Sequence, residues 1–383
     1  MNLVALRMLI GDRAKYFGIL VGLAFASLLI TQQGAILLGL TTRTWQFIAD
    51  TPAADLWVMD PEMEHHADSK KMLGRELDRV RSVEGVEWAV PMYRAFATLR
   101  LPNGSLRTCI LVGVDDASLI GAPMEFVQGS AESLRGEGAV VVDQATLLDK
   151  LGVRGPTGDK RPIAVGDVLE LNDRRAVVAG VYRQSPQFFW EPTVYTTYSR
   201  AKDFAPAERR QLTFVMVKVR AGADVAAVQR AIREQTGMEC RTNAEFKLQT
   251  AMYILTQTGI LINFAIAVGL GFLVGAAIAG QTFYNFVNDN LRYFAALKAI
   301  GASDWTLARM VMLQAGVASA IGFGLGAGAA ALFGRSVGDT LAFYLPWPLL
   351  VFSGAAVGLI AAGSAFVGVL KLRRLEPAVV FKA

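Results

Sequence analysis

The residues that could perform metal or acid–base chemistry are few and lie close together in the sequence. The two histidines, His65 and His66, are adjacent and stand beside Glu62, Glu64 and Asp68. Imidazole and carboxylate groups at this spacing could bind a metal ion, although a solvated acidic loop is the commoner arrangement and the one that we expect. Because both histidines fall in this segment, no Ser–His–Asp or Cys–His constellation can form elsewhere. Other catalytic chemistries stay formally open.

Glycine-rich segments raise the question of nucleotide binding. No Gly-x-x-x-x-Gly-Lys-Ser/Thr motif occurs, so the chain carries no P-loop of its own. The glycines of residues 322–328, together with Gly354 and Gly358, lie in long apolar runs, where small residues let helix backbones approach each other. We therefore expect the chain to be non-catalytic and to bind no cofactor or metal itself.

Four long stretches of the sequence contain no charged residue. They are residues 16–42, 248–288, 310–334 and 340–370. Each exceeds the roughly 20 residues that cross a hydrocarbon core about 30 Å thick, which excludes a wholly soluble protein. The sequence predicts a membrane protein with four transmembrane α-helices, placed at 16–42, within 243–288, at 304–334 and at 340–370.

The first apolar run imitates a signal peptide, because Ala24-Phe25-Ala26 resembles a cleavage site. The run continues for sixteen residues beyond that point, much further than the apolar region of a signal peptide. We therefore expect a retained membrane helix.

The orientation follows from the basic residues near the helix ends. These are Arg7, Arg13 and Lys15, then Arg292, Lys298 and Arg309, and finally Lys371, Arg373, Arg374 and Lys382. The connection between the third and fourth helices carries only Arg335. Both termini and the 289–309 loop are therefore predicted to be cytoplasmic, in a bacterial inner membrane. Residues 371–383 form the cytoplasmic tail, and residues 1–15 an interfacial helix with Leu3, Leu6, Leu9 and Ile10 on one face.

The net charge is distributed unevenly. Residues 43–247 carry a net charge of −1 and the remainder carries +6. The positive charge therefore lies at the cytoplasmic fringe, where it would attract anionic lipid or an acidic partner surface. No exposed domain is strongly basic, which excludes a nucleic-acid-binding protein.

Residues 43–242 are expected to form an extracytoplasmic α+β domain inserted after the first helix. The expected strands are 54–59, 86–100, 106–114, 139–142, 168–171, 176–182 and 212–219, and the expected helices are 70–83, a segment ending near 152, and 224–235. Asn103-Gly104 and Asn172-Asp173 mark hairpin turns. Cys109 and Cys240 lie here, where an oxidising compartment would permit a bridge, and their spacing leaves that question open.

The segment after this domain is predicted to form a stalk. Thr242 and Glu245 match a capping box at a helix start, and no proline follows as far as Asn288. A helix of about 45 residues would be about 68 Å long, so that about half of it would project beyond the bilayer, with Thr250 among the polar residues of the projecting part. The alternative is a break near Gly259.

The cytoplasmic connection 289–303 is predicted to be a short amphipathic helix. Leu291, Phe294 and Leu297 recur at three-residue spacing, Gly301 suits the position after the helix, and Ser303 can cap the next one. The four spans contain no charge that could couple transport to an ion gradient. The energy for any work is therefore expected to come from a partner.

Two motifs resemble those of the MacB/FtsX-like permeases of mechanotransmissive (type VII) ABC transporters. Residues 291–303, Leu-Arg-Tyr-Phe-Ala-Ala-Leu-Lys-Ala-Ile-Gly-Ala-Ser, are similar to the family's cytoplasmic segment, and residues 372–378, Leu-Arg-Arg-Leu-Glu-Pro-Ala, are similar to its ending. Gly280-Gln281-Thr282-Phe283-Tyr284 and Lys298 resemble the DevC-like branch most. Tyr293 stands where many relatives carry an acid.

The resemblance implies a homodimeric permease, each copy bound to a separate ATPase chain that holds ATP and Mg²⁺. Leu291, Arg292, Phe294, Leu297, Lys298 and Gly301 would form the ATPase contact. The resemblance implies an export permease working with a periplasmic adaptor (membrane fusion) protein and an outer-membrane channel. Two alternatives stay open: a permease that extracts a lipid or lipoprotein, and an FtsX-like regulator of an extracytoplasmic cell-wall hydrolase.

Overall fold

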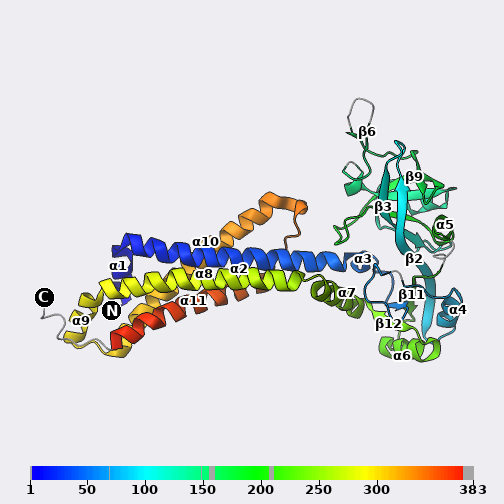
Figure 1. Cartoon of the computed structure of the whole chain (residues 1–383). Helices are drawn as coiled ribbons and strands as arrows, with labels where there is room; N and C mark the ends of the chain where they lie inside the picture. Colours follow the sequence, from blue (N-terminus) through cyan, green and yellow to red (C-terminus); the bar gives the residue numbers. More distant parts are fainter. Residues whose placement is uncertain (1, 69, 148, 155–159, 207–210, 374–383) are drawn as a thin grey trace. The chain divides into compact units, whose positions relative to one another are not determined.

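The computed structural model describes residues 2–68, 70–147, 149–154, 160–206 and 211–373 (Figure 1). The chain forms two compact units. Met1–Thr41 and Thr256–Ala383 make up the membrane unit, and Thr42–Leu255 make up the inserted unit. Helix α2 (Arg13–Thr44) begins in the membrane unit and ends, without interruption, in the inserted unit.

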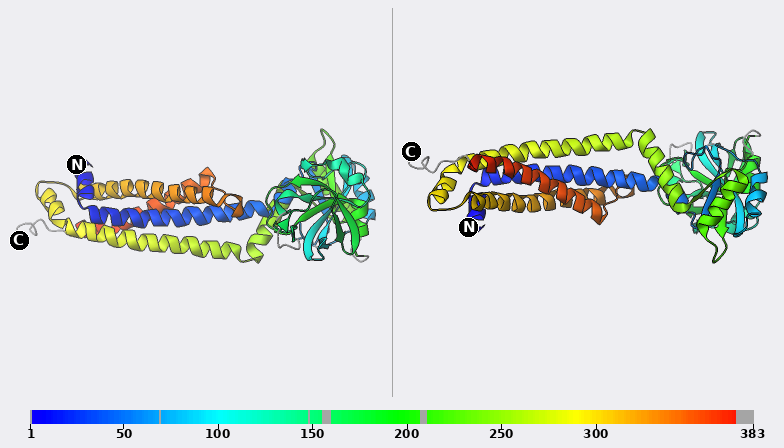
Figure 2. Two further views of the ribbon diagram at one scale, coloured as in Figure 1. Left: turned by 90° about the horizontal axis from the view of Figure 1, so that it is seen from above. Right: turned by 90° about the horizontal axis from the view of Figure 1, so that it is seen from below.

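Among the described residues, four helices are long and apolar enough to cross a membrane, and they run side by side (Figure 2). They are α2, α8 (Ile260–Asp289), α10 (Asp304–Val337) and α11 (Trp347–Arg373). Helix α11 begins seven residues later than predicted, after a 3₁₀ turn at Gly338–Thr340. The residue before Pro346 is disfavoured in helical conformation, whereas Pro348 fits the first helical turn. The tail after residue 373, with its predicted motif, lies outside the described residues.

Small residues bring these helices into close contact. A Cβ atom at Gly322 would lie 2.7 Å from Leu23 Cβ, and one at Gly326 would collide with the Ala24 carbonyl, so α10 packs directly on α2. The predicted packing role is confirmed for these two glycines. A Cβ at Gly358 would meet nothing within 4 Å, so the same role is not seen there.

Helix α1 (Asn2–Gly11) packs on α10 rather than presenting one apolar face outwards. Ala5 and Leu9 are buried in the core of the membrane unit, whereas Leu3 and Ile10 are exposed. The predicted apolar face is therefore divided between the core and the surroundings. Gln314 Nε2 donates a hydrogen bond of 2.7 Å to the Ala5 carbonyl and fixes the contact.

The inserted unit is built on a mixed sheet. In the described part of the chain this sheet has ten strands, in the order β12-β1-β11-β2-β3-β10-β5-β9-β4, with β8 pairing to β2 and β9. The strands are β1 (Leu56–Met59), β2 (Val86–Arg100), β3 (Leu106–Val114), β4 (Glu125–Gln128), β5 (Ala139–Asp143), β8 (Val168–Leu171), β9 (Arg174–Arg183), β10 (Thr193–Thr197), β11 (Phe214–Val219) and β12 (Glu239–Thr242). A separate two-stranded hairpin pairs β6 (Val153–Arg154) with β7 (Lys160–Arg161).

Strand β2 joins the two halves of this sheet. Its first half pairs with β11 and its second half pairs with β3. The predicted bounds of β2 and β3 are confirmed, and Gly104 supplies the positive φ of their turn. Asn172 and Asp173 both have positive φ between β8 and β9, as a two-residue hairpin turn requires.

Helices cover parts of the sheet. They are α3 (Gln46–Ala49), α4 (Arg75–Arg81), α5 (Tyr198–Phe204), α6 (Val225–Thr236) and α7 (Asn243–Gln257), with 3₁₀ turns at Ala131–Arg135 and Gln144–Thr146. The α+β class is confirmed, with parallel pairs β3–β10 and β5–β9 among antiparallel ones.

Two predicted helices differ from the structure. The helix expected at 70–83 is reduced to α4, because Met72 forms a β-bridge with Leu212 instead. The helix expected after β5 is a single 3₁₀ turn within the described residues.

The edge strand β12 is covered by side chains. The Cys240 carbonyl accepts hydrogen bonds from Gln229 Nε2 at 2.8 Å and Arg233 Nη2 at 2.6 Å. The backbone N–H of Thr242 donates to Glu245 Oε2 at 2.9 Å. Cys109 and Cys240 are both buried free thiols, which answers the question of a disulfide.

Candidate coupling site at the α8–α9–α10 corner

The corner of the membrane unit is formed by three consecutive helices. Helix α8 ends at Asp289, α9 spans Leu291–Ala299, and α10 begins at Asp304. Asn290 lies between the first two, and its Nδ2 donates to the Phe286 carbonyl at 2.8 Å. This amide closes the last turn of α8 while the chain changes direction.

The end of α9 is fixed by a Schellman motif. The Gly301 N–H donates to the Lys298 carbonyl at 3.1 Å, and the Ala302 N–H donates to the Leu297 carbonyl at 3.0 Å. Gly301 has φ of +103°, which only glycine adopts without strain. Ser303 Oγ then accepts from the Thr306 N–H at 3.2 Å and caps α10. The predicted roles of Gly301 and Ser303 are confirmed.

The apolar face predicted to contact a partner points into the chain itself. Phe294 is completely buried in the core of the membrane unit, in the same hydrophobic cluster as Phe286 and Leu307. Leu291 and Leu297 are partly buried and pack against the same core. The three side chains therefore hold α9 onto its own unit, and Phe294, predicted as an apolar anchor of the ATPase contact, is buried within the chain instead.

The opposite face of the corner is exposed, and of its residues only Arg292 was among those predicted for the partner contact. Tyr293 is 64% exposed, Ile300 is 85% exposed and Trp305 is 76% exposed. Arg292 is also exposed, whereas Lys298 forms an ion pair of 2.8 Å with Asp304. We call Arg292, Tyr293, Ile300 and Trp305 the corner surface. The signal in the sequence was that Ile300 and Trp305 flank Gly301, where a chain reversal leaves side chains without a helical neighbour.

The predicted stalk begins with the expected cap. The Glu245 N–H donates to Thr242 Oγ1 at 3.2 Å, and the Thr242 N–H donates back to Glu245, so the capping box is confirmed. Beyond this start, α7 does not project. Phe246 and Thr250 are fully buried in the inserted unit, and Trp57 Nε1 donates to Asn243 Oδ1 at 2.6 Å.

The continuous helix predicted from Thr242 to Asn288 is wrong. Helix α7 ends at Gln257 and α8 begins at Ile260, with Gly259 between them at φ of +70°. A glycine in the left-handed conformation commonly ends a helix. The Asn263 N–H bonds to the Gly259 carbonyl at 3.0 Å, which starts α8. The alternative of a break at this glycine is the correct one.

The two histidines pack in the inserted unit rather than in a solvated loop. His66 is buried and its Nε2 lies 2.9 Å from the Thr44 carbonyl. Arg94 Nη1 donates to the His66 carbonyl at 2.9 Å. Burial, and next the charge of Arg94, hold the pKa of His66 well below its usual range. Among the described residues, no three or more His, Cys, Asp or Glu side chains gather in a way that could hold a metal ion.

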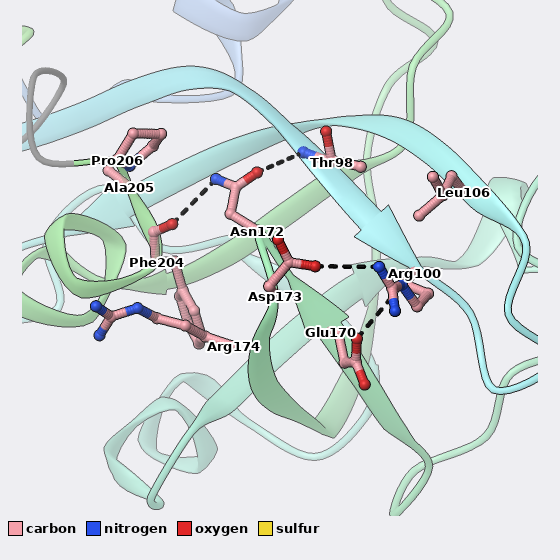
Figure 3. Close-up of a pocket in the computed structure, with 10 residues that line it drawn as sticks. All are labelled: Thr98, Arg100, Leu106, Glu170, Asn172, Asp173, Arg174, Phe204, Ala205 and Pro206. Carbon is pink, nitrogen blue, oxygen red and sulfur yellow. Dashed lines mark hydrogen bonds and ion pairs between the residues drawn. The ribbon is translucent and has the colours of Figure 1, made fainter.

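A polar hollow of about 540 Å³ opens beside the β8–β9 turn (Figure 3). Arg100 pairs there with Asp173 at 3.1 Å and with Glu170 at 3.4 Å. Asn172 bridges the Thr98 N–H and the Phe204 carbonyl at 2.9 and 3.0 Å. These contacts stabilise the turn, and the residues that line the hollow supply no nucleophile paired with a base.

Family models match almost the whole chain. The model described as a MacB-like periplasmic core domain matches residues 17–235, and the model described as an FtsX-like permease C-terminal domain matches residues 251–377. The chain belongs to the MacB/FtsX-like ABC permease family. It is therefore a multi-pass membrane protein and a transporter component, and its inserted unit is the family's extracytoplasmic domain.

Two solved structures are similar to this MacB/FtsX-like permease at low identity. The extracellular domain of the noncanonic ABC-type transporter YknZ from Gram-positive bacteria is 14% identical, with a TM-score of 0.34, covering 49% of this chain and 98% of that one. The periplasmic region of MacB from Actinobacillus actinomycetemcomitans is 12% identical, with a TM-score of 0.38, covering 52% and 94%. No curated protein sequence matches this chain.

The boundary between the two matched models falls near the start of α7. The corner surface lies in the part that matches the FtsX-like permease domain, whereas Thr242, Glu245 and Thr250 lie at or before its start. In this MacB/FtsX-like permease the candidate coupling site and the extracytoplasmic domain thus belong to different matched segments.

Proposed function

We propose that the chain is the permease subunit of an ABC-type export complex in a bacterial inner membrane. Both termini and the corner surface face the cytoplasm, and a separate ATPase chain binds that surface. The permease works as a homodimer, with a periplasmic adaptor and an outer-membrane duct. Family membership and the absence of a P-loop support a division of labour between permease and ATPase.

The observation that carries this proposal is the corner surface itself. Three large apolar or aromatic side chains are exposed on a corner whose backbone is fixed by a Schellman motif and a serine cap. Aromatic residues on a rigid support are enriched at the energetic centres of protein interfaces. Arg292 beside them offers a charge-assisted hydrogen bond to an acidic partner.

The connections between the two units suggest how motion is passed on. Helix α2 enters the inserted unit unbroken, and its end is held by the His66–Thr44 bond. The return connection is interrupted at Gly259. We propose that α2 transmits the displacement and that Gly259 acts as the hinge that permits it. This replaces the stalk at 243–260 as the rigid element.

The test is co-purification of the ATPase with corner variants. The double variant Tyr293→Ala with Ile300→Ala should release the ABC ATPase found by mass spectrometry with the wild-type permease, because each buried anchor commonly contributes over 1 kcal/mol. Ile262→Ala, an exposed residue in the first turn of α8, is the matched control and should retain it. Undiminished ATPase binding by the double variant would contradict the assignment. The purified chain alone should not hydrolyse ATP.

A further inference from the structure

Helix α8 has one face that packs within the chain and one that does not. Its buried residues recur at three- to four-residue spacing and are Gly271, Gly275, Ala279, Phe283, Phe286 and Val287. Figure 2 shows α8 along one side of the membrane unit in both views. The opposite face of the helix carries Ala277, Gln281 and Asn285, which are all exposed. We call these three residues the amide face. Gln281 belongs to the motif of residues 280–284, which the corner surface does not include.

The two carboxamides of the amide face bond to each other. Gln281 Nε2 donates to Asn285 Oδ1 at 3.3 Å, one turn further along α8, which is longer than most hydrogen bonds. Among the described residues, Gln281 Oε1 and Asn285 Nδ2 form no further hydrogen bond. A carboxamide has two N–H donors and a carbonyl oxygen that accepts. One acceptor and one donor group are therefore left open on the exposed side of the helix.

The position of the amides along α8 places Gln281 inside the bilayer. Helix α8 has 30 residues, which is about 45 Å of helix, whereas a hydrocarbon core is about 30 Å thick. A centred helix therefore extends about 7 Å beyond the core at each end. Asp289, the last residue of α8, pairs with Lys15 and marks the end that faces water. Gln281 lies about 12 Å and Asn285 about 6 Å from that end, so Gln281 is within the hydrocarbon and Asn285 at its edge.

The chemistry of the amide face favours a second copy of this chain as its partner. Acyl chains neither donate nor accept hydrogen bonds, and polar side chains within the membrane commonly bond to another helix. An ATPase bound at the corner surface lies outside the bilayer and does not reach Gln281. A carboxamide is complementary to another carboxamide, because it carries a donor and an acceptor together. An interface about a two-fold axis brings identical surfaces together, so the open acceptor of one copy meets the open donor of the other.

We propose that Gln281 and Asn285 form the contact through which two copies of the permease meet inside the membrane. Gln281 Oε1 of one copy accepts a hydrogen bond from Asn285 Nδ2 of the second copy, and the same bond is repeated by symmetry. Ala277 lies one turn from Gln281 on this face, and its small side chain lets two α8 helices approach closely. Leu273 and Ile278, which are 64% and 40% exposed, lie to either side of the amide face and suit lipid.

This inference rests on the homodimer of the proposed function and assigns its membrane contact to one helix face. It does not depend on which ATPase or adaptor the permease uses. The amide face and the corner surface share no residue. A change at Gln281 should therefore leave ATPase binding intact, so that failure of one assignment can be told from failure of the other.

The experiment cross-links introduced cysteines in the full-length permease in its native membranes. Ala277→Cys places a thiol on the amide face, and Leu359→Cys is the control, because Leu359 is 68% exposed on α11. Residues near a two-fold axis lie close to their own copies, so oxidation with copper phenanthroline should join two chains that carry Ala277→Cys. The native cysteines are buried in the inserted unit and leave the introduced thiol as the reactive one.

Ala277→Cys should form covalent dimers several-fold faster than Leu359→Cys. The role of the amide is tested by diluting the permease in lipid vesicles and measuring the dimer fraction. Gln281→Leu should weaken association about three- to thirty-fold, the range measured for hydrogen bonds between membrane helices. Gln281→Asn keeps a carboxamide and should retain most of the association. Because Gln281 is exposed, neither change should disturb folding, and co-purification of the ATPase should confirm this.

Dimers that cross-link through other positions but not through Ala277→Cys would overturn this inference and leave the homodimer intact. A permease that stays monomeric in the membrane would overturn both. Cross-linking of Ala277→Cys only to a different membrane protein would assign the amide face to that protein and contradict the contact between copies. An equal dimer fraction for Gln281→Leu and the wild-type protein would overturn the role of the amide.

Discussion

Arg94 Nη1 donates a hydrogen bond of 2.9 Å to the carbonyl of His66, inside the extracytoplasmic domain. The Arg94 guanidinium also lies 4.5 Å from the Phe47 ring centroid. Burial lowers the pKa of Arg94 to about 10, so the group stays charged at neutral pH. A buried cation thus lies beside a buried neutral imidazole, and among the described residues no carboxylate forms an ion pair with either.

This relationship predicts that the packing around His66 weakens in acid. The folded domain holds the pKa of His66 well below the value of 6.5 that the unfolded chain has. Between these two pKa values the unfolded state binds more protons, so stability is fully present above pH about 6.5 and is lost as the pH falls below it. The loss is at most about 1.4 kcal/mol per pH unit for one such group.

Hydrogen exchange of the full-length permease at pH 7.5 and pH 5.5, corrected for intrinsic exchange rates, should detect the effect. Amides at 63–68 should lose protection at the lower pH. His66→Gln keeps a donor for the Thr44 carbonyl but does not titrate, and should show a smaller difference between the two pH values. Identical pH dependence in both proteins would rule His66 out as the cause.

The two native thiols should be inert in the folded protein. Burial raises the pKa of Cys109 and of Cys240 to about 12, against an ordinary value of 9.0. Thiolate is the reactive form, so N-ethylmaleimide at pH 8 should label neither cysteine in detergent-solubilised permease. Two labels per chain should appear after denaturation, as measured by intact mass. Rapid labelling of the native protein would show that one of the two strands opens.

Adjacent residues on α9 should differ sharply in their effect on stability. Phe294→Ala leaves a cavity in the core of the membrane unit, and such truncations cost about 3 to 5 kcal/mol. Tyr293→Ala changes an exposed side chain and should cost less than about 0.5 kcal/mol. Thermal unfolding in detergent should therefore separate the two variants, while only Tyr293→Ala, combined with Ile300→Ala, tests the ATPase contact. Equal destabilisation would mean that Tyr293 is also buried.

Gly259 should control the angle between α7 and α8. Alanine at its left-handed φ costs about 1 to 2 kcal/mol, so Gly259→Ala should favour a continuous helix through this point. Spin labels at the exposed Leu248 and Ile262 would then lie about 21 Å apart along the helix axis. Double electron–electron resonance should show that this separation is more populated in Gly259→Ala than in the wild-type protein, in which it should remain a minor population. An unchanged distance distribution would argue against a hinge.

The sequence predicted best what depends on neighbouring residues. The Asn103-Gly104 turn located the hairpin, and β2 and β3 flank it at the predicted bounds. The capping box of Thr242 and Glu245 and the cap at Ser303 are likewise local interactions. The absence of proline between Thr242 and Asn288 did not ensure a continuous helix, because Gly259 interrupts it.

The sequence pattern could not predict contacts between residues that are far apart in the chain. The three-residue spacing identified the face of α9 that includes Phe294, but it did not tell whether that face meets the chain's own core or a partner. Similarly, nothing near His66 in the sequence indicates the carbonyl of Thr44 or the side chain of Arg94 as its neighbours. The Phe188 N–H likewise bonds to the carbonyl of Arg43, which is 145 residues away.

The side chains that cover the edge strand β12 also affect whether the folded domain can aggregate. An incoming strand can pair only with free backbone groups. The Cys240 carbonyl is taken by Gln229 and Arg233, and the Thr242 N–H by Glu245, so both groups are already occupied when the domain is folded. These three side chains therefore block aggregation through the edge strand β12. A variant in which Gln229 and Arg233 are both truncated should still fold. It should form oligomers in which β12 pairs with a strand of another copy, whereas the native domain should not.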